Sequence, residues 1–226
     1  MAELVLALDT RDRGSALALL DRLPSVRWVK VGSVLFTETG PELVATLKRR
    51  GHQVFLDLKW HDIPNTVRGA TARARAAGVD MVTVHAFGGS AMMAAAKEGG
   101  GDGMLVVAVT VLTSYSPEAL SAIVGRPAVP EVEVARLAQL AMAAGIDGVV
   151  ASPMEAAALR RALPTGATLV TPGIRFGDEA KDDQARTATP GAAARAGATH
   201  LVVGRPVLEA ADPLLAWQRF AAELTR

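Results

Sequence analysis

The sequence contains no cysteine among its 226 residues, and aromatic residues make up only 4% of it. The absence of cysteine excludes disulfides, a thiolate nucleophile and metal sites with cysteine ligands, and it suits a reducing compartment. No apolar run approaches the roughly 18 residues of a membrane span. Only five apolar residues lie between Glu3 and Asp9, so we also expect no signal peptide. These absences predict a cytoplasmic, soluble protein with no membrane partner.

Neither sign of charge dominates the sequence. Its 24 Lys and Arg residues nearly balance its 23 Asp and Glu residues, which leaves a formal net charge of +1. This balance, without a block of like charges, argues against nucleic acid as a partner. Half of the residues are hydrophobic, which is enough to build the core of a single domain spanning residues 1–226.

Short apolar runs rich in β-branched residues alternate with Ala- and Leu-rich segments of helical periodicity, and this alternation predicts strand followed by helix throughout. Most of the runs are apolar on both faces, as in parallel strands covered by helices. The dinucleotide-binding and P-loop glycine motifs are missing. We therefore expect an α/β fold, a single (β/α)8 TIM barrel. The eight predicted strands are 4–8, 28–31, 54–58, 81–84, 105–111, 148–151, 168–171 and 201–203.

In a barrel of this kind the reactive groups lie at the carboxyl ends of the strands. Asp57 and Lys59 are two residues apart on the third predicted strand, so we expect both side chains to point into the barrel mouth. Buried charges there need partners, which Lys30, Asp9 and the nearby Asp62 could supply. The alternative is an ion-pair network with a structural role only. Other strand-end candidates are His85, Thr110 and Thr113.

A second group of residues follows the last two predicted strands, where barrels of this class often bind phosphate. Arg175 and Arg205 could bind a phosphate in a bidentate manner, and Gly204 would let the backbone approach it. Gln184 lies in the long polar stretch 173–190, which we interpret as a lid over the site or a disordered insert. Together these residues predict a phosphorylated ligand.

The sequence gives little support for a metal site. Its four histidines, at positions 52, 61, 85 and 200, form no close pair and no H-E-x-x-H motif. A single Mg2+ ion held by strand-end carboxylates stays open as an alternative. No G-x-S-x-G motif supports a serine nucleophile. We expect no metal and no cofactor.

The segment 57–66, DLKWHDIPNT, resembles the signature of the orotidine 5'-monophosphate decarboxylase family. The resemblance extends over nearly the whole chain and is closest to the shorter, bacterial type. It also includes LALD at 6–9, VKVG at 29–32, AVTVLTS at 108–114, TPGIR at 171–175 and VVGRP at 202–206.

This resemblance implies a homodimeric barrel that converts orotidine 5'-monophosphate (OMP) to uridine 5'-monophosphate (UMP) and CO2 in pyrimidine biosynthesis, without a cofactor. It implies that Lys59 protonates C6 of the pyrimidine and that Asp57 lies near the departing carboxylate. Lys30 would hold Asp57, and Asp62 and Thr66 would come from the partner subunit. The implied substrate-binding residues are Asp9, Lys30, Asp57, Ile63, Thr66, Thr113, Arg175, Gln184, Gly204 and Arg205.

Two other functions are compatible with these residues. A Mg2+-dependent sugar-phosphate decarboxylase or aldolase of the same suprafamily shares the Asp-x-Lys-x-x-Asp core, although the continuation Ile63-Pro64-Asn65-Thr66 argues against it. A non-catalytic barrel that binds a phosphorylated ligand would use the same charges structurally. Loss of activity with a chelator would distinguish the Mg2+-dependent enzyme from the cofactor-free decarboxylase. Turnover of the substrate would distinguish either enzyme from a non-catalytic binding protein.

Overall fold

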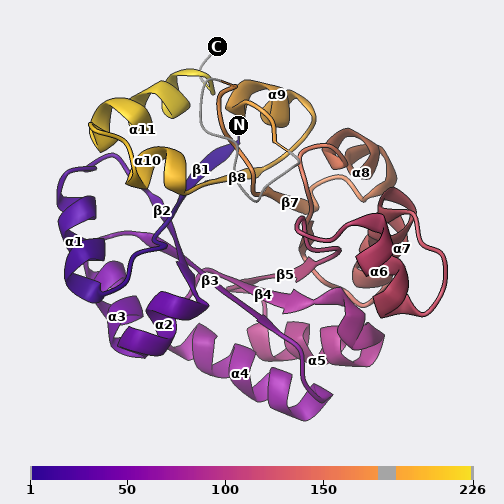
Figure 1. Cartoon of the computed structure of the whole chain (residues 1–226). Coiled ribbons are helices and arrows are strands. Elements are labelled where there is room, and N and C mark those ends of the chain that lie inside the picture. The colour runs from indigo at the N-terminus through magenta and orange to yellow at the C-terminus, as the bar shows by residue number, and fades with distance from the viewer. Residues whose placement is uncertain (1, 178–186, 225–226) are drawn as a thin grey trace.

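Eight parallel strands form a closed barrel in the computed structural model, which describes residues 2–177 and 187–224. Each strand pairs with the next one along the chain, and β8 pairs with β1 to close the ring (Figure 1). This arrangement confirms the predicted (β/α)8 barrel. The strands are β1 (Glu3–Ala7), β2 (Trp28–Gly32), β3 (Gln53–Trp60), β4 (Met81–His85), β5 (Leu105–Val109), β6 (Gly148–Val150), β7 (Thr168–Thr171) and β8 (His200–Val203).

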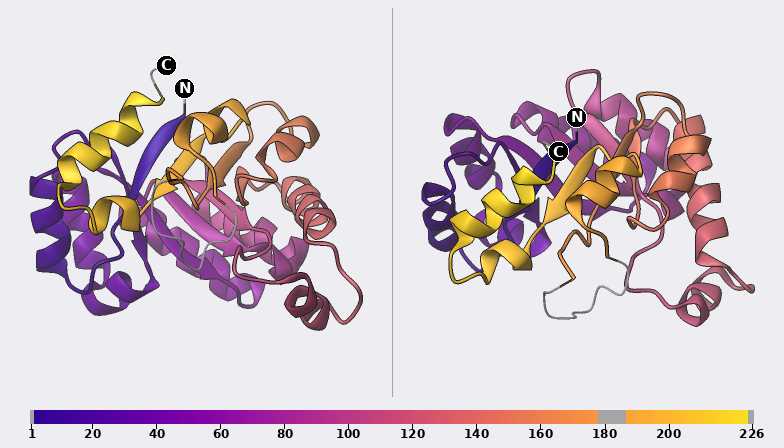
Figure 2. Two further views of the ribbon diagram at one scale, coloured as in Figure 1. Left: turned by 45° about the horizontal axis from the view of Figure 1, so that its top comes forward. Right: turned by 90° about the horizontal axis from the view of Figure 1, so that it is seen from above.

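Helices surround the barrel and cover the outer face of its strands (Figures 1 and 2). None of the helices within residues 2–177 and 187–224 is long and apolar enough to cross a membrane. The helices are α1 (Arg13–Asp21), α2 (Ser33–Thr39), α3 (Pro41–Arg49), α4 (Pro64–Ala76), the 3-10 turn η1 (Ala86–Gly88), α5 (Gly89–Gly100), α6 (Pro117–Val124), α7 (Pro130–Ala143), α8 (Ala156–Ala162), α9 (Pro190–Arg195), α10 (Arg205–Leu208) and α11 (Pro213–Ala222).

Local sequence signals set where many of these helices begin and end. Proline occupies the first turn of several of them, where its missing N–H costs nothing. The Asp12 carboxylate accepts a hydrogen bond from the Ser15 amide at 2.8 Å and so caps α1, a contact typically worth about 1 kcal/mol. Gly51 and Gly78, with φ of 85° and 83°, follow the ends of α3 and α4. These glycines adopt the left-handed conformation that stops a helix before the next strand.

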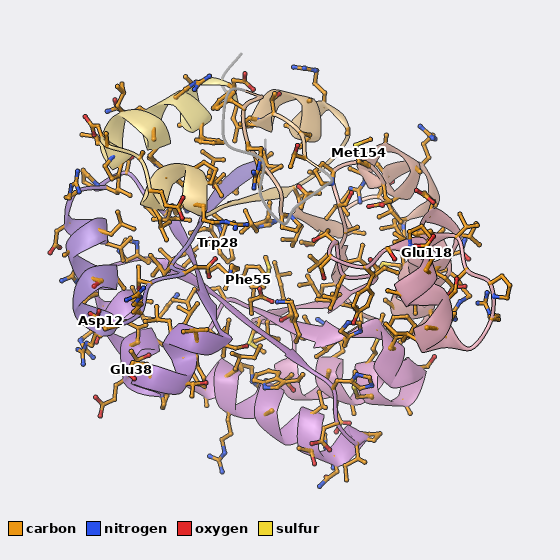
Figure 3. All side chains as sticks on the ribbon, viewed as in Figure 1. Asp12, Trp28, Glu38, Phe55, Glu118 and Met154 are labelled. Carbon is orange, nitrogen blue, oxygen red and sulfur yellow. The ribbon has the colours of Figure 1, made fainter. Side chains whose placement is uncertain are left out.

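The strands bury both of their faces, as their apolar composition predicts. Outward-facing side chains join the helices in one large core, and inward-facing ones form a second cluster that fills the lower barrel. Trp28 and Phe55 belong to this inner cluster and lie within the ring of strands, whereas Asp12, Glu38 and Glu118 lie at the periphery (Figure 3). A packed interior is typical of this fold, in which ligands bind at the end of the barrel where the strands have their carboxyl ends.

His200 lies inside the barrel at the start of β8, with its ring edge-on to Trp28 at 5.1 Å between centroids. Only 9% of the residue is exposed. Burial lowers the pKa of His200 to about 4, because the charged imidazolium loses its hydration there. The folded protein therefore keeps this ring neutral at pH values at which an unfolded chain has already bound a proton.

This difference predicts an acid-sensitive barrel. As the pH is lowered from 7.5 to 5.0, the unfolded chain gains a proton at position 200 and the folded chain does not. The free energy of unfolding therefore decreases as the pH decreases. For a pKa that moves from 6.5 to about 4, the expected loss is roughly 2 kcal/mol. Urea unfolding of the parent and of His200→Gln at both pH values measures it. The variant should start less stable but lose less between the two pH values; an equal loss in both proteins contradicts the prediction.

Candidate active site

A pocket opens at the carboxyl ends of the strands, where the sequence places its polar strand-end residues. Its cavity has a volume of about 240 Å³, which leaves room for a small-molecule ligand. Its lining mixes apolar residues of the barrel core with charged residues from segments far apart in the sequence. The predicted site residues that line it are Asp9, Lys30, Asp57, Lys59, Thr113, Arg175, Gly204 and Arg205.

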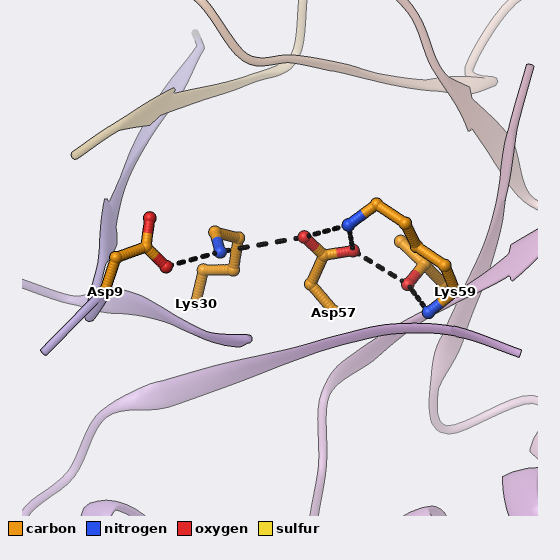
Figure 4. Close-up of polar contacts among 5 residues, drawn as sticks. Asp9, Lys30, Asp57 and Lys59 are labelled. Carbon is orange, nitrogen blue, oxygen red and sulfur yellow. Dashed lines mark hydrogen bonds and ion pairs between the residues drawn. The ribbon is translucent and has the colours of Figure 1, made fainter. Parts of the chain in front are cut away.

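Four of these residues form a continuous row of alternating charges across the pocket (Figure 4). Lys30 Nζ lies 3.0 Å from Asp9 Oδ1 and 3.6 Å from Asp57 Oδ2. Lys59 Nζ donates to both oxygens of Asp57 at 2.9 Å. The strands β1, β2 and β3 are neighbours in the barrel, so their carboxyl ends bring these side chains together. Of the partners expected for Asp57 and Lys59, Lys30 and Asp9 therefore join the row within one chain.

Burial differs along this row. The side chains of Lys30 and Asp57 are 12% and 13% exposed, whereas those of Asp9 and Lys59 are 55% and 40% exposed. Burial alone would raise the pKa of Asp57, but the charges of Lys30 and Lys59 and the hydrogen bonds that it accepts hold this pKa below its ordinary value. Asp57 is therefore a fixed negative charge beside the Lys59 ammonium at neutral pH.

The end of β3 is irregular around Asp57 and Lys59, the two charged residues at the centre of the row. Leu56 pairs with Val82 and Trp60 with Val84, so Asp57, Leu58 and Lys59 lie opposite Thr83 alone. Lys59 has a φ of 51°, and it is the one residue other than glycine with a positive φ in the part of the chain that is described. Such a conformation costs about 1–2 kcal/mol in a residue with a Cβ atom. Strained backbone of this kind is often found at active sites.

Thr83 was missed by the sequence reasoning, although the period-2 alternation of β4 could have placed it on the inner face between Met81 and His85. Its hydroxyl accepts the Lys59 amide at 2.8 Å and donates to Asp57 Oδ1 at 2.9 Å. The residue is 1% exposed. Thr83 therefore joins the backbone of one charged residue to the side chain of the other.

Three predicted site residues lie away from this pocket. Asp62, Ile63 and Thr66 are all exposed, around the start of α4. Asp62 Oδ1 accepts a hydrogen bond from the Ile63 amide at 2.6 Å, and among the described residues no ion pair joins Asp62 to Lys59. The side chain of Ile63 projects its apolar surface into solvent, with 66% of the residue exposed. Within a single chain these residues do not complete the row of charges.

Two other strand-end candidates, His85 and Thr110, are held by packing and hydrogen bonds within the fold. His85 stacks between His61 and Phe87, with ring centroids 5.7 and 5.5 Å apart. Burial, together with the nearby His61 and Lys59, lowers the pKa of His85 to about 4, so its ring is neutral at physiological pH. Thr110 is fully buried, and its hydroxyl donates to the Val150 carbonyl at 2.9 Å. It stabilises the junction of β5 and β6.

The wall formed after β7 and β8 contains the residues predicted to bind phosphate. Gly204 precedes α10, and a Cβ atom at its position would lie 3.4 Å from the Ala7 Cβ and 3.5 Å from Asp9 Oδ2. The two ends of the long segment after β7 pair with each other, since the Arg175 amide donates to the Ala188 carbonyl at 3.0 Å. Gln184 lies outside the described residues, as does the middle of the predicted lid. The pocket thus has anionic and cationic residues on one side and guanidinium groups on the other.

The carboxylates of the pocket are not arranged as metal ligands. Its two carboxylates, Asp9 and Asp57, are bridged by Lys30, whose ammonium lies between them. Within residues 2–177 and 187–224, no group of three histidine, aspartate or glutamate side chains has an arrangement that could hold a metal ion. The arrangement is suited instead to chemistry in which an ammonium group stabilises a developing negative charge and supplies a proton.

Known proteins are similar to this sequence over almost its full length. The chain is 54% identical over 227 residues to the orotidine 5'-phosphate decarboxylase of Alkalilimnicola ehrlichii, covering 99% of this chain and 96% of that protein. It is 48% identical to that of Nitrosomonas eutropha, covering 99% and 97% of the two chains. Both relatives are orotidine 5'-phosphate decarboxylases, and both are matched over nearly their full length.

Solved structures share the fold as well. The crystal structure of orotidine 5'-phosphate decarboxylase from Lactobacillus acidophilus matches with a TM-score of 0.89 and 34% identity, covering 100% of both chains. The family model for orotidine 5'-phosphate decarboxylase / HUMPS proteins matches residues 2–220. The chain therefore belongs to the orotidine 5'-phosphate decarboxylase / HUMPS family.

Proposed function

We propose that this protein decarboxylates OMP to UMP and CO2, a step of pyrimidine biosynthesis. The observation that carries the proposal is the row Asp9, Lys30, Asp57 and Lys59, which holds an ammonium group against a buried carboxylate in the pocket. Relatives that are 54% and 48% identical over nearly the whole chain support this substrate.

Lys59 is the proposed acid. Breaking the bond between C6 and the carboxylate leaves the electron pair on C6, in the plane of the ring, where the pyrimidine π-system cannot delocalise it. A fixed cation is then the most direct stabilisation available. The Lys59 ammonium supplies that charge, and its proton forms the new C6–H bond as CO2 departs. The neutral amine afterwards regains a proton from solvent.

Asp57 and Lys30 prepare the site for this step. Asp57 holds Lys59 through two hydrogen bonds of 2.9 Å, so the ammonium needs little reorganisation during the reaction. The same carboxylate repels the negative charge of the substrate carboxylate, which favours its departure. Lys30 neutralises Asp57 from the other side and can reach a ribose hydroxyl together with Asp9.

The remaining pocket residues are proposed to bind the nucleotide. Thr113 would contact the pyrimidine edge, and Arg175, Gly204 and Arg205, with Gln184, would bind the phosphate. Guanidinium groups and a glycine backbone suit a phosphate monoester. Binding energy gained at the phosphate can then position the ring over Lys59. This division predicts that OMP, not free orotidine, is the useful substrate.

We also propose a homodimer whose active sites are shared. Asp62, Ile63 and Thr66 are exposed around the start of α4 and do not line the pocket of their own chain. In a symmetric dimer, the same surface of each subunit could supply these residues to the other pocket. Because nucleotide substrates carry charged phosphates, which do not cross membranes freely, we place the enzyme in the cytoplasm with the pool of its substrate.

The proposal predicts turnover that needs no divalent metal. The purified protein, incubated with OMP and excess EDTA, should remove the pyrimidine carboxylate, a change that ultraviolet absorbance follows. Orotidine without its phosphate is the control substrate and should react far more slowly. Activity that appears only with Mg2+ and a pentulose or hexulose phosphate would favour the sugar-phosphate reaction instead. Binding of UMP without any turnover of OMP would favour a non-catalytic barrel.

A further inference from the structure

Thr83 is a buried polar residue that contacts two charged residues of the site. It lies on β4, opposite the irregular end of β3, and its side chain is hidden from solvent. In the part of the chain that the structure describes, it is not one of the residues that line the pocket. Any influence on the reaction must therefore pass through Asp57 or Lys59.

The direction of both hydrogen bonds at Thr83 is fixed by its partners. The Lys59 amide can only donate, at 2.8 Å, and the Asp57 carboxylate, 2.9 Å away, accepts. The hydroxyl proton therefore points toward Asp57. A hydroxyl group with a donor on one side and an anion on the other has a single orientation, so it fixes the relative positions of the two groups.

The geometry of β3 shows what this contact replaces. Asp57, Leu58 and Lys59 lie opposite one residue of β4, so the regular ladder is interrupted there. The amide of Lys59, the residue with the positive φ of 51°, donates to a side chain instead of a strand carbonyl. The hydroxyl therefore occupies the place of a missing ladder acceptor. It stabilises the conformation that directs the Lys59 side chain back to Asp57 (Figure 4).

We propose that Thr83 is a positioning residue for the reaction, whose hydroxyl sets the Lys59 ammonium and the Asp57 carboxylate in their reactive arrangement. This proposal rests on the proposed decarboxylase function. It assigns to the hydroxyl an effect on the chemical step and little effect on substrate affinity, because Thr83 contacts Asp57 and Lys59 and does not itself line the pocket. The methyl group of Thr83 has only a packing role.

The test compares two substitutions that separate the hydroxyl from the methyl group. Thr83→Val keeps the shape and removes the hydroxyl, whereas Thr83→Ser keeps the hydroxyl. With OMP as substrate, we expect Thr83→Val to lower kcat by about 10- to 100-fold while KM changes by less than about 3-fold. Thr83→Ser should retain kcat within about 3-fold of the parent.

Thr71→Val is the matched control, because Thr71 is equally buried but its hydroxyl donates only to carbonyls of α4. This variant should leave kcat unchanged even if its melting temperature falls. If Thr83→Val does not fold, Thr83→Ala and Thr83→Ser give the same comparison. A kcat of Thr83→Val equal to that of an active parent, or equal losses in Val and Ser, overturns the proposal. An inactive parent instead overturns the proposed function.

Discussion

Lys59→Ala should abolish decarboxylation of OMP while the protein stays folded and still binds UMP. We expect kcat to fall by at least about 10^4-fold, because the variant loses both the cation that stabilises the carbanion and the proton donor. Binding should change much less, since the proposed phosphate and ribose contacts come from other residues of the pocket. The loss should therefore appear in kcat rather than in the affinity for UMP.

The surroundings of Lys59 explain why the fold should tolerate this change. The side chain is 40% exposed and projects into the pocket, not into the core. Asp57 loses two hydrogen bonds in the variant but keeps Lys30 at 3.6 Å and the Thr83 hydroxyl at 2.9 Å. Alanine also keeps a Cβ atom at the position with positive φ, so the local backbone strain is similar in both proteins.

The measurement is single-turnover decarboxylation of OMP, with UMP binding measured by calorimetry. Lys48→Ala is the matched control. Lys48, on α3, is also ion-paired, at 2.6 Å to Asp80, which lies just before β4 at the opposite end of the barrel from the pocket. That variant should keep its kcat and lose only stability. If Lys59→Ala retains more than about a tenth of the parent kcat, the role of Lys59 as acid and stabilising cation is wrong.

The architecture could be predicted from the sequence because it depends on local patterns. Runs that are apolar on both faces indicate parallel strands, and glycines such as Gly51 and Gly78 mark where helices end. Strand bounds followed from the same patterns to within about two residues. The fifth strand was predicted too long: it ends at Val109, and the amide and hydroxyl of Thr110 both donate to the Val150 carbonyl of β6.

The meeting of Asp57 and Lys59 was predicted on the assumption of a regular strand. The two side chains do meet, but through a bulge and a positive φ at Lys59 that alternation alone does not contain. Sequence patterns average over favourable backbone conformations, so a strained residue held by a buried hydroxyl lies outside their reach. The role proposed for Thr83 depends on its hydrogen bond with the Lys59 amide, which the sequence does not show.

Asp62 shows a second limit of prediction from one chain. Its position five residues after Asp57 suggested that its carboxylate could approach Lys59. In the folded chain, Asp62 is exposed and faces its own neighbour, the Ile63 amide. The neighbouring Ile63 is apolar, and none of the described residues shields its side chain from solvent. Both observations are accounted for if this surface meets a second subunit.

Mixing two inactive variants should therefore restore activity. Lys59→Ala lacks the acid, and Asp62→Ala lacks the carboxylate proposed to enter the partner's pocket. Random pairing makes half of the dimers mixed, and each mixed dimer has one site with both residues intact. About a quarter of the parent activity should return. Co-expression with two affinity tags allows the mixed dimer to be purified, and in this preparation about half of the parent activity is expected, since one of its two sites is intact.

The matched control pairs Lys59→Ala with Lys30→Ala. Lys30 and Lys59 both contact Asp57 of the same chain, so these two variants damage the same half of the site and no mixed dimer can regain an intact one. Recovery in the first mixture but not in the second therefore identifies Asp62 as the residue that crosses the interface. A doubly tagged dimer of Lys59→Ala and Asp62→Ala without activity would show that each pocket is completed within its own chain. The exposed surface around Ile63 would then need another explanation.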